Sequence, residues 1–178
     1  MADRVDINSY VVDIPDYPQP GVVFKDITPI FSHSEAFMQV VDDIATHFEG
    51  RGITKVVSPE ARGFMLGAPV ACRLGVGFVP ARKPGKLPRE TVSVSYDLEY
   101  GTDSIEIHTD ALEAGDRILV IDDLAATGGT ARAVAQLAEK EGATVAGYGF
   151  ILELAFLNPR ETLVDSDDID MFSLIVSE

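Results

Sequence analysis

Residues 117–141 read RILVIDDLAATGGTARAVAQLAEKE, and this stretch decides the fold. Its first part, 118–121, is a short apolar run rich in β-branched residues, which is typical of a strand buried on both faces of a parallel sheet. Small residues follow, and then Val134, Leu137 and Ala138 recur at helical spacing before Gly142. The stretch therefore predicts a strand, a tight loop and a helix.

The loop between this strand and helix consists of Ala, Thr and Gly residues. Without bulky side chains, backbone N–H groups at the start of a helix can converge on an anion, which the helix dipole also favours. No Lys follows the glycines as it does in G-x-x-x-x-G-K-[ST], and no G-x-G-x-x-G opens a helix. The loop predicts a phosphate site that is neither an NTPase P-loop nor a dinucleotide-binding turn.

Two carboxylates, Asp122 and Asp123, stand beside this phosphate site. Because they would repel the phosphate itself, we expect them to accept hydrogen bonds from hydroxyl groups or to hold a hydrated cation. A ligand with both a phosphate and vicinal hydroxyls is a sugar phosphate. The simpler alternative is an ordinary turn in which the acids only cap the helix.

The composition is that of one globular domain, with 178 residues, of which 46% are hydrophobic and 24% charged. No apolar run reaches the length of a membrane span, and the first residues lack a signal-peptide pattern, so we predict a cytoplasmic protein with no membrane partner. The net charge of −15 disfavours nucleic-acid binding. This acidity fits a high-salt cytoplasm or solubility alone.

The single cysteine and the three histidines bound the possible redox and metal chemistry. Cys72 has no partner for an internal disulfide and lies in an apolar stretch, where we expect a buried structural thiol. The histidines are far apart in the sequence, and no Cys/His cluster has the spacing of metal ligands. A structural transition-metal site is therefore not expected.

The N-terminal part combines an irregular segment with a helix. Residues 13–29 contain four prolines, which predict an extended arm, and the apolar VVF within it should pack over another part of the chain. Ser32 and Glu35 form a predicted capping box for a helix that ends at Gly50.

Two further strands end in residues that suit an anion site. The strand 53–57 runs into SPEARGF and a helix over 65–74, which places Arg62 in a turn at the carboxyl edge of the sheet, where such folds bind ligands. The strand 76–81 ends in ARKPGKLPRE, which holds four of the 14 positive charges. In so acidic a chain this cluster favours an anion site over a solvated surface. Its members are Arg82, Lys83, Lys86 and Arg89.

The remaining patterns complete an α/β chain. Residues 91–110 predict a hairpin with an exposed face, whose loop carries Glu99 and Tyr100. Strands follow at 143–152 and 171–176, and between them 165–170 is an acidic, solvated turn. Five short apolar strands, three of them followed by helices, predict a doubly wound sheet without a second domain.

Five motifs, found in the family's order, resemble the adenine phosphoribosyltransferases, which are type I phosphoribosyltransferases: PGVVFKDITP, EARGF, RKPGKLP, YDLEYG and IDDLAATGGT. The resemblance implies one domain over 1–178 with a doubly wound, mainly parallel sheet, an N-terminal hood segment over about 1–30 and a flexible β-hairpin lid. It implies transfer of phosphoribose from phosphoribosyl pyrophosphate (PRPP) to adenine, giving AMP and pyrophosphate. It also implies Mg²⁺, held mainly by substrate and water, and a homodimer.

The resemblance further implies a role for each motif residue. The ribose hydroxyls and the 5-phosphate would be bound by Asp122, Asp123, Ala126, Thr127, Gly128, Gly129 and Thr130. The pyrophosphate would be bound by Arg62 and, across the dimer interface, by Arg82, Lys83 and Lys86. The nucleobase would contact Val23, Phe24, Lys25 and Leu124. Glu99 would be the catalytic group that manages protons on the purine, with Tyr100 beside it on the lid.

Two positions depart from the family's pattern. Lys25 stands where arginine is common, and a lysine lacks the planar fork for a bidentate contact. Ala125 stands where leucine is common. Two alternatives remain: a phosphoribosyltransferase for a 6-oxo purine, because the phosphate loop does not read the base, and a PRPP-sensing regulator without enzyme activity. The regulator would need a DNA-binding addition, usually basic, for which the chain has no spare residues.

Overall fold

The structure is a computed structural model that describes residues 4–97 and 102–178. The helices are η1 (Ile7–Tyr10), α1 (Thr28–Ser32), α2 (Ser34–Phe48), α3 (Arg62–Leu74), α4 (Gly129–Lys140), η2 (Ala155–Leu157) and α5 (Pro159–Leu163). The strands are β1 (Val12–Pro15), β2 (Val23–Asp26), β3 (Lys55–Pro59), β4 (Gly77–Ala81), β5 (Thr91–Asp97), β6 (Thr102–His108), β7 (Arg117–Ile121), β8 (Leu124–Ala125), β9 (Thr144–Leu154) and β10 (Asp170–Ser177).

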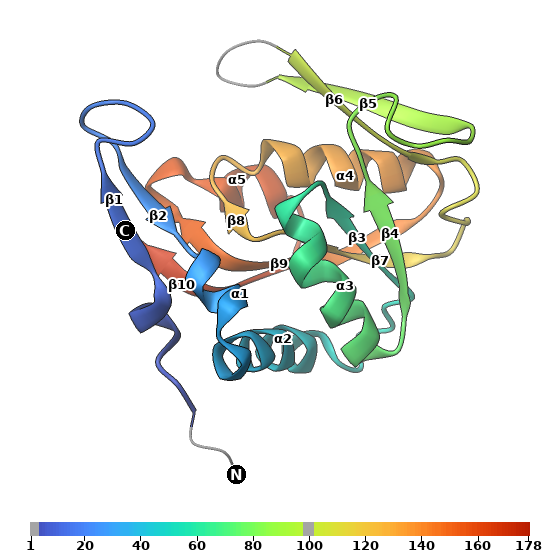
Figure 1. Cartoon of the computed structure of the whole chain (residues 1–178). Coiled ribbons are helices and arrows are strands. Elements are labelled where there is room, and N and C mark those ends of the chain that lie inside the picture. Colours follow the sequence, from blue (N-terminus) through green and yellow to red (C-terminus); the bar gives the residue numbers. More distant parts are fainter. Residues whose placement is uncertain (1–3, 98–101) are drawn as a thin grey trace.

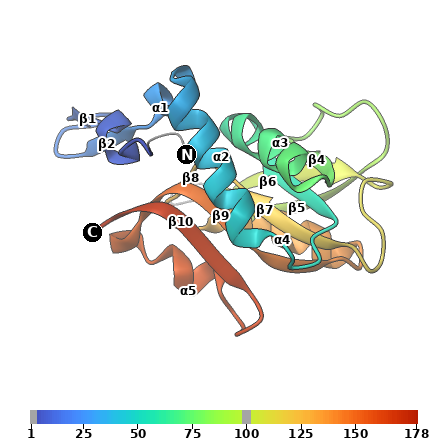
Figure 2. The ribbon, with the colours of Figure 1, turned by 90° about the horizontal axis from the view of Figure 1, so that it is seen from below.

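The central sheet is parallel, with the order β10-β9-β7-β3-β4, and the short β8 also pairs with β9. In Figure 1, α2 and α3 cover one face of this sheet and α4 and α5 cover the other. Figure 2, seen from below, shows α2 and α3 lying against the sheet. The predicted doubly wound, mainly parallel sheet is therefore confirmed, and all five of its predicted strands are present.

Each face of the sheet has its own hydrophobic core. Ile118 and Val120 of β7 pack on the side of α4, whereas Leu119 and Ile121 pack on the side of α2 and α3. These four side chains are fully buried. The apolar run 118–121 thus lies in the central strand of the sheet, and it ends directly at the two aspartates.

Two antiparallel hairpins lie outside the central sheet. The predicted hairpin is β5–β6, although Ile105 and Ile107 bury one of its faces. The prediction that residues 13–29 form no regular element is wrong, because β1 pairs with β2 from Val12↔Asp26 to Pro15↔Val23. Pro15 stands at the end of β1, and Pro18 and Pro20 stand in the turn, so they leave the ladder hydrogen bonds of β2 intact. Tyr17 packs edge-on against Phe24 within this hairpin.

Two local predictions are wrong, and a third is wrong at its last residue. Ser32 ends α1 and its hydroxyl donates to the carbonyl of Pro29, so α2 begins after His33 without a capping box. Cys72 is exposed, because the buried face of α3 carries Val70 and Ala71 and leaves the next position on the outside. The predicted acidic turn is present over 165–169, but Asp170 is the first residue of β10 and binds His47 and Arg51, so it does not belong to that solvated turn.

Within the described residues, none of the helices combines the length and the apolar character that crossing a bilayer requires.

Candidate active site at the carboxyl edge of the sheet

The two aspartates that follow β7 are held by backbone hydrogen bonds from the neighbouring strand β9. The N–H of Asp122 donates to the carbonyl of Gly149 over 3.2 Å, and the carbonyl of Asp123 accepts from the N–H groups of Ile151 and Leu152. The N–H of Asp123 also donates to Oδ1 of Asp122 over 2.8 Å. The position of both side chains is therefore fixed by the centre of the sheet.

A close ion pair joins Asp123 to Arg62. The Nε of Arg62 lies 2.9 Å from Oδ2 of Asp123, whose side chain is 3% exposed, while the arginine side chain is 51% exposed. Arg62 is the first residue of α3, one turn earlier than the predicted helix start. The next residue, Gly63, has no Cβ, and a Cβ there would lie 2.9 Å from Oδ1 of Asp122. This glycine lets α3 approach the carboxylates.

Burial and mutual repulsion control the ionisation of the aspartates. Burial raises the pKa of Asp122 well above its ordinary value, and the charge of Asp123 raises it further. Burial also raises the pKa of Asp123, and the nearby Arg62 guanidinium opposes this shift. Ligands that bring a positive charge or hydroxyl donors would stabilise the ionised pair.

The phosphate loop connects β8 to α4. Gly128 precedes α4 with a φ of +84°, in the left-handed region that favours glycine. A Cβ at Gly128 would lie 3.0 Å from Cγ of Leu163 and 3.3 Å from the carbonyl oxygen of Pro159. Among the described residues, no side chain caps the first turn of α4. Its N–H groups are therefore available to an anion, as the sequence predicted.

A small hollow lies between the β1–β2 hairpin and the aspartates. It has a volume of about 80 Å³ and its walls are Phe24, Lys25, Asp26, Ile27, Thr28, Arg62, Asp123 and Leu124. Three of the four predicted nucleobase residues are thus brought together with Arg62 and Asp123. The fourth, Val23, does not line the hollow and is 53% exposed. Lys25 forms an ion pair with Asp13 across the hairpin, with Nζ 2.7 Å from Oδ1.

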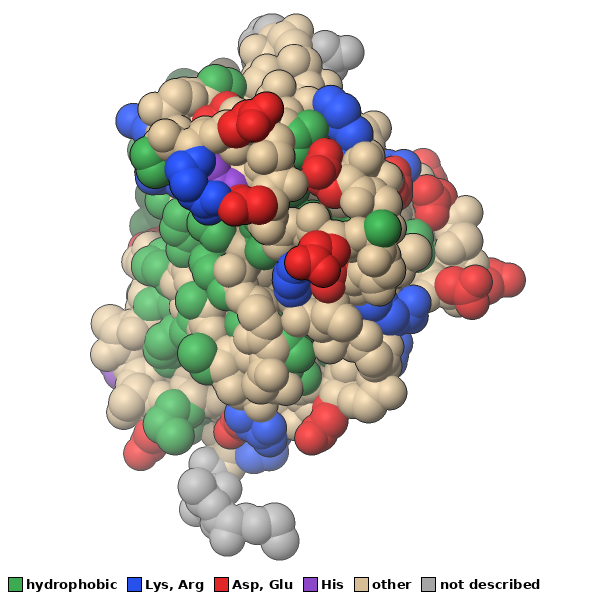
Figure 3. Space-filling view, turned by 90° about the vertical axis from the view of Figure 1, so that its right-hand side faces the viewer, with side chains coloured by type: hydrophobic (Ala, Val, Ile, Leu, Met, Phe, Trp, Pro, Cys, Tyr) green, Lys and Arg blue, Asp and Glu red, His purple; other side chains and the backbone are tan. Residues whose placement is uncertain are grey.

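The basic loop, residues 82–89, is tied to the β5–β6 hairpin and to Glu60. Arg82 donates through Nε to Oε2 of Glu60 over 2.7 Å, and Nζ of Lys83 lies 2.9 Å from Oδ2 of Asp103. Arg89 pairs with Asp110. In Figure 3, Lys and Arg side chains lie next to Asp and Glu side chains at several places on the face shown. Within residues 4–97 and 102–178, no hydrogen bond or ion pair joins Lys83 or the exposed Lys86 to the aspartates that follow β7.

Sequence reasoning missed a buried glutamate that shapes the basic loop. Glu106 is buried; its Oε1 accepts from the N–H of Gly85 and its Oε2 accepts from the hydroxyl of Thr91. Its backbone also exchanges two hydrogen bonds with Arg82. Because Glu106 alternates with isoleucines in β6, the pattern predicted an exposed position. Glu60, the partner of Arg82, was also missed, although it stands two residues before Arg62 in the EARGF motif.

The predicted lid residues and the predicted Mg²⁺ remain to be considered. Glu99 and Tyr100 lie outside the described residues. Among the described residues, no group of three or more His, Cys, Asp or Glu side chains is arranged to hold a metal ion. The two adjacent carboxylates are nevertheless oxygen donors of the kind that Mg²⁺ accepts, and Mg²⁺ usually keeps several waters and substrate oxygens as further ligands.

Comparisons with known proteins agree with this geometry. Residues 29–177 match the model of the phosphoribosyl transferase domain. Over 159 residues the chain is 57% identical to an adenine phosphoribosyltransferase from Thermobifida fusca, covering 89% of this chain and 90% of that protein. The crystal structure of the adenine phosphoribosyltransferase from Thermoanaerobacter pseudethanolicus superposes with a TM-score of 0.90 at 50% identity, covering 96% of this chain and 98% of that one.

A second solved structure was determined with ligands. It is the adenine phosphoribosyltransferase from Saccharomyces cerevisiae in complex with adenine and an imino-altritol bisphosphate. This structure is 38% identical to the chain, with a TM-score of 0.87, and covers 94% of this chain and 96% of that one.

Proposed function

The chain belongs to the phosphoribosyl transferase family, and from this premise we infer that it transfers phosphoribose from PRPP to adenine, giving AMP and pyrophosphate in purine salvage. It is therefore an enzyme, a pentosyltransferase. One observation in the structure carries the inference best: the hollow that joins Phe24 and Leu124 to Arg62 and Asp123. A base bound there would lie beside the carboxylates that we assign to the sugar.

We assign the sugar phosphate to the stretch that follows β7. Asp122 and Asp123 accept hydrogen bonds from the ribose hydroxyls, because a carboxylate is the strongest acceptor for such donors. The 5-phosphate binds the loop formed by Ala126, Thr127, Gly128, Gly129 and Thr130. The uncapped first turn of α4 supports this assignment, since its N–H groups and the helix dipole both favour an anion.

The pyrophosphate needs cations as it leaves, because its departure concentrates negative charge on the leaving group while the ribose becomes oxocarbenium-like. Arg62 is proposed for this role, since its exposed guanidinium can turn from Asp123 towards the leaving group. Mg²⁺ bound with PRPP would neutralise part of the same charge, and Asp122 and Asp123 could hold it through water. The ionised aspartates, in turn, favour the developing positive charge on the ribose.

The remaining cations, Arg82, Lys83 and Lys86, are proposed to complete the pyrophosphate site from a second copy of the chain. Two observations support a homodimer. Among the described residues, Arg82 and Lys83 form ion pairs with Glu60 and with Asp103 of β6, and with neither aspartate of their own chain. Apolar side chains are also exposed on α2 and α3, among them Met38 and Met65. Light scattering at micromolar concentration would test this, and a monomer that turns over at the full rate would reject it.

The nucleobase and lid roles also remain proposals. We propose that residues 1–30 form a hood within a single domain over 1–178, in which Phe24 stacks on adenine, with Val23, Lys25 and Leu124 around it. Glu99 would manage protons on the purine and Tyr100 would lie on the lid that excludes water. Glu99→Gln is expected to lower turnover strongly with little loss of PRPP affinity.

Cytoplasmic location stays a prediction, which fractionation of cells would test.

The experiment that tests the function is AMP production from adenine, PRPP and Mg²⁺, with hypoxanthine, guanine and xanthine assayed alongside. We expect turnover with adenine alone. Turnover only with a 6-oxo purine would keep the phosphate site and reject the assignment of the base. Binding of PRPP without reaction of any base would reject the enzyme.

A further inference from the structure

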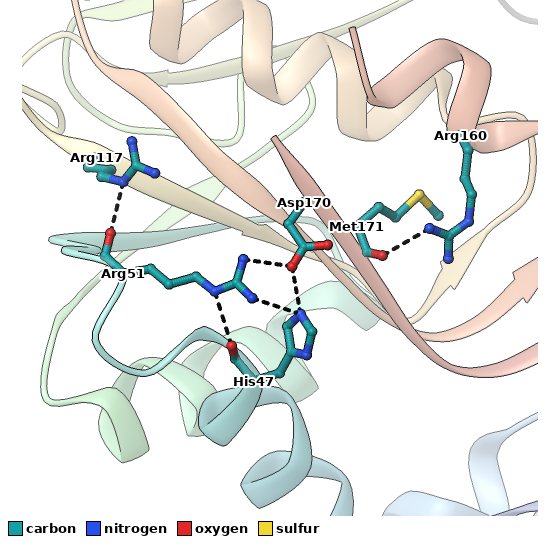
Figure 4. Close-up of polar contacts among 6 residues, drawn as sticks. All are labelled: His47, Arg51, Arg117, Arg160, Asp170 and Met171. Carbon is teal, nitrogen blue, oxygen red and sulfur yellow. Dashed lines mark hydrogen bonds and ion pairs between the residues drawn. The ribbon is translucent and has the colours of Figure 1, made fainter. Parts of the chain in front are cut away.

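Glu153, near the end of β9, is a buried carboxylate that the proposed reaction does not use. It is 2% exposed, and Arg160 of α5 binds it through two parallel hydrogen bonds, Nε to Oε1 and Nη2 to Oε2, both 2.7 Å long. A third hydrogen bond runs from Nη1 of Arg160 to the carbonyl of Met171 in β10 over 3.1 Å, as Figure 4 shows. One guanidinium therefore fastens α5 to two strands, which requires the planar fork of arginine.

The helix that Arg160 fastens lies against the phosphate loop. Leu163 is fully buried, and its Cγ would lie 3.0 Å from a Cβ at Gly128; the carbonyl oxygen of Pro159 would lie 3.3 Å from the same point. Both residues belong to α5, on either side of Arg160. On the other side of the loop, Ala125 of β8 is in register with Glu153 of β9. The ion pair thus links α5, which lies against Gly128, to the part of β9 that pairs with β8 just before the loop.

α5 has little stability of its own. It has five residues, and its N-cap Asn158 makes no side-chain capping bond, whereas isolated helices need about 12 residues or more to persist in water. Its position must therefore come from tertiary contacts, and the Arg160 fork supplies directional ones. A shift of α5 would move Leu163 and Pro159, and with them the backbone at Gly128.

We propose that Arg160 and Glu153 are a positioning pair for the phosphate loop. They hold α5 against Gly128, so that the N–H groups of residues 127–130 converge on the 5-phosphate, and they do not touch the substrate. This inference rests on the proposed function, because it assumes that the loop binds the 5-phosphate.

The test compares two ligands in Arg160→Met by calorimetry: ribose 5-phosphate, which needs the loop, and pyrophosphate with Mg²⁺, which does not. We expect ribose 5-phosphate to bind about 10-fold more weakly, because a small displacement of the N–H groups weakens their hydrogen bonds to the phosphate. We expect pyrophosphate to bind within about twofold of the wild type. Equal loss of both ligands would overturn the proposal, and so would unchanged binding of both.

Arg51→Met is the matched control. Arg51 also pairs with a residue of β10, with its Nη1 2.6 Å from Oδ2 of Asp170, but this cluster lies at the opposite side of β10 from Arg160 in Figure 4. We expect its binding of both ligands to equal that of the wild type. A loss of ribose 5-phosphate binding in this control as large as that in Arg160→Met would also overturn the proposal.

A double variant separates positioning from stability. Arg160→Met alone leaves the Glu153 charge buried without a partner, whereas Glu153→Met/Arg160→Met removes both charges and replaces them with side chains of similar volume. We expect the double variant to melt at a higher temperature than Arg160→Met, while its ribose 5-phosphate binding stays weak. Arg160→Lys, which keeps the charge but loses the fork, should lie between Arg160→Met and the wild type. Full binding in the double variant would overturn the proposal.

Failure of this inference can be told apart from failure of the proposed function. A wild-type protein that does not bind ribose 5-phosphate, or a Gly128→Ala variant that binds it normally, would reject the phosphate loop itself. Normal binding by the wild type, loss in Gly128→Ala and normal binding in Arg160→Met would reject only the positioning pair.

Discussion

The phosphate loop and the basic loop belong to one proposed site but are built differently. The phosphate loop follows the central strand and is closely packed. A Cβ at Gly128 would lie 3.0 Å from Cγ of Leu163 and 3.3 Å from the carbonyl oxygen of Pro159. The basic loop is held to the hairpin by partly exposed ion pairs such as Lys83–Asp103, and the nucleobase hairpin is held in a similar way by Lys25–Asp13. Exposed ion pairs contribute little stability and exchange partners readily. We call the phosphate loop the buried half of the site, and the basic loop with the β1–β2 hairpin the exposed half. The buried half should therefore tolerate almost no substitution, and the exposed half should tolerate conservative substitutions.

Arg62 pairs with the buried Asp123 and also lines the hollow beside Phe24 and Lys25, so its loss should have the largest effect. Arg62→Met removes a charge next to the leaving pyrophosphate and leaves the buried Asp123 without its cation. We expect kcat/KM for PRPP to fall about 100- to 1000-fold, the usual result of removing a group that stabilises charge in the transition state. Steady-state kinetics with varied PRPP would measure it.

Arg73→Met provides the control on the same helix. Arg73 forms a surface ion pair with Asp42, so its loss should change the free energy of unfolding by less than about 1 kcal/mol and leave the kinetics unchanged. An Arg62→Met enzyme with the kinetics of Arg73→Met would show that Asp123 needs no cation during the reaction.

Gly128→Ala should have the next largest effect, because it tests how rigid the buried half is. The added Cβ meets Leu163 and Pro159, and the backbone there has a positive φ. We expect kcat/KM for PRPP to fall about 100-fold. Gly75 has a φ of +70° with nothing within 4 Å of its Cβ position, so Gly75→Ala carries the backbone penalty without the clash. Gly75→Ala should keep normal kinetics, and normal kinetics in Gly128→Ala as well would contradict the assignment of the 5-phosphate to this loop.

Asp122 should make the free energy of unfolding fall as pH rises, whereas an acid with a lowered pKa makes it rise. Because the pKa of Asp122 is raised in the folded state, the folded protein holds its proton more tightly than the unfolded chain. This contribution makes the free energy of unfolding fall as pH rises above about 4, the unfolded value, towards the raised pKa. Without ligands, Asp122→Asn should therefore melt a few degrees higher than the wild type at neutral pH, and the difference should shrink towards pH 4.

Asp116→Asn gives the opposite sign. Burial opposes the shift, but hydrogen bonds from Lys55, from the N–H of Glu113 and from Thr54 lower the pKa of Asp116 in the folded protein. The stability that it contributes is present above the unfolded pKa and is lost as pH falls through the lowered one. Its variant should melt below the wild type at neutral pH. Thermal melts from pH 3 to pH 8 would compare the two variants, and curves that change in the same direction would contradict the assignment.

The parts of the fold that the sequence predicts well are those whose determinants are contiguous. β7, the phosphate loop and α4 lie within 25 residues, so periodicity and glycine placement suffice to predict them. Glu106 and the Glu153–Arg160 pair depend on which strands and helices pack together, and no local pattern carries that information. The hairpin of β1 and β2 was missed because the prolines that interrupt its sequence fall in the turn and at a strand end, a fact that only pairing reveals.

The smallest effect is expected for Lys25→Arg, in the exposed half. The variant keeps a positive charge near Asp13, which now lies 2.7 Å from Nζ of Lys25, and adds a planar fork on a wall of the hollow beside Phe24. Because the pair with Asp13 is partly exposed, we expect kcat to stay the same and KM for adenine to change less than about threefold. Lys25→Met, which removes the charge, should raise KM for adenine more than Lys25→Arg does. A loss in Lys25→Arg as large as that in Gly128→Ala would show that the hairpin is as intolerant of change as the phosphate loop, and would remove the distinction between the two halves.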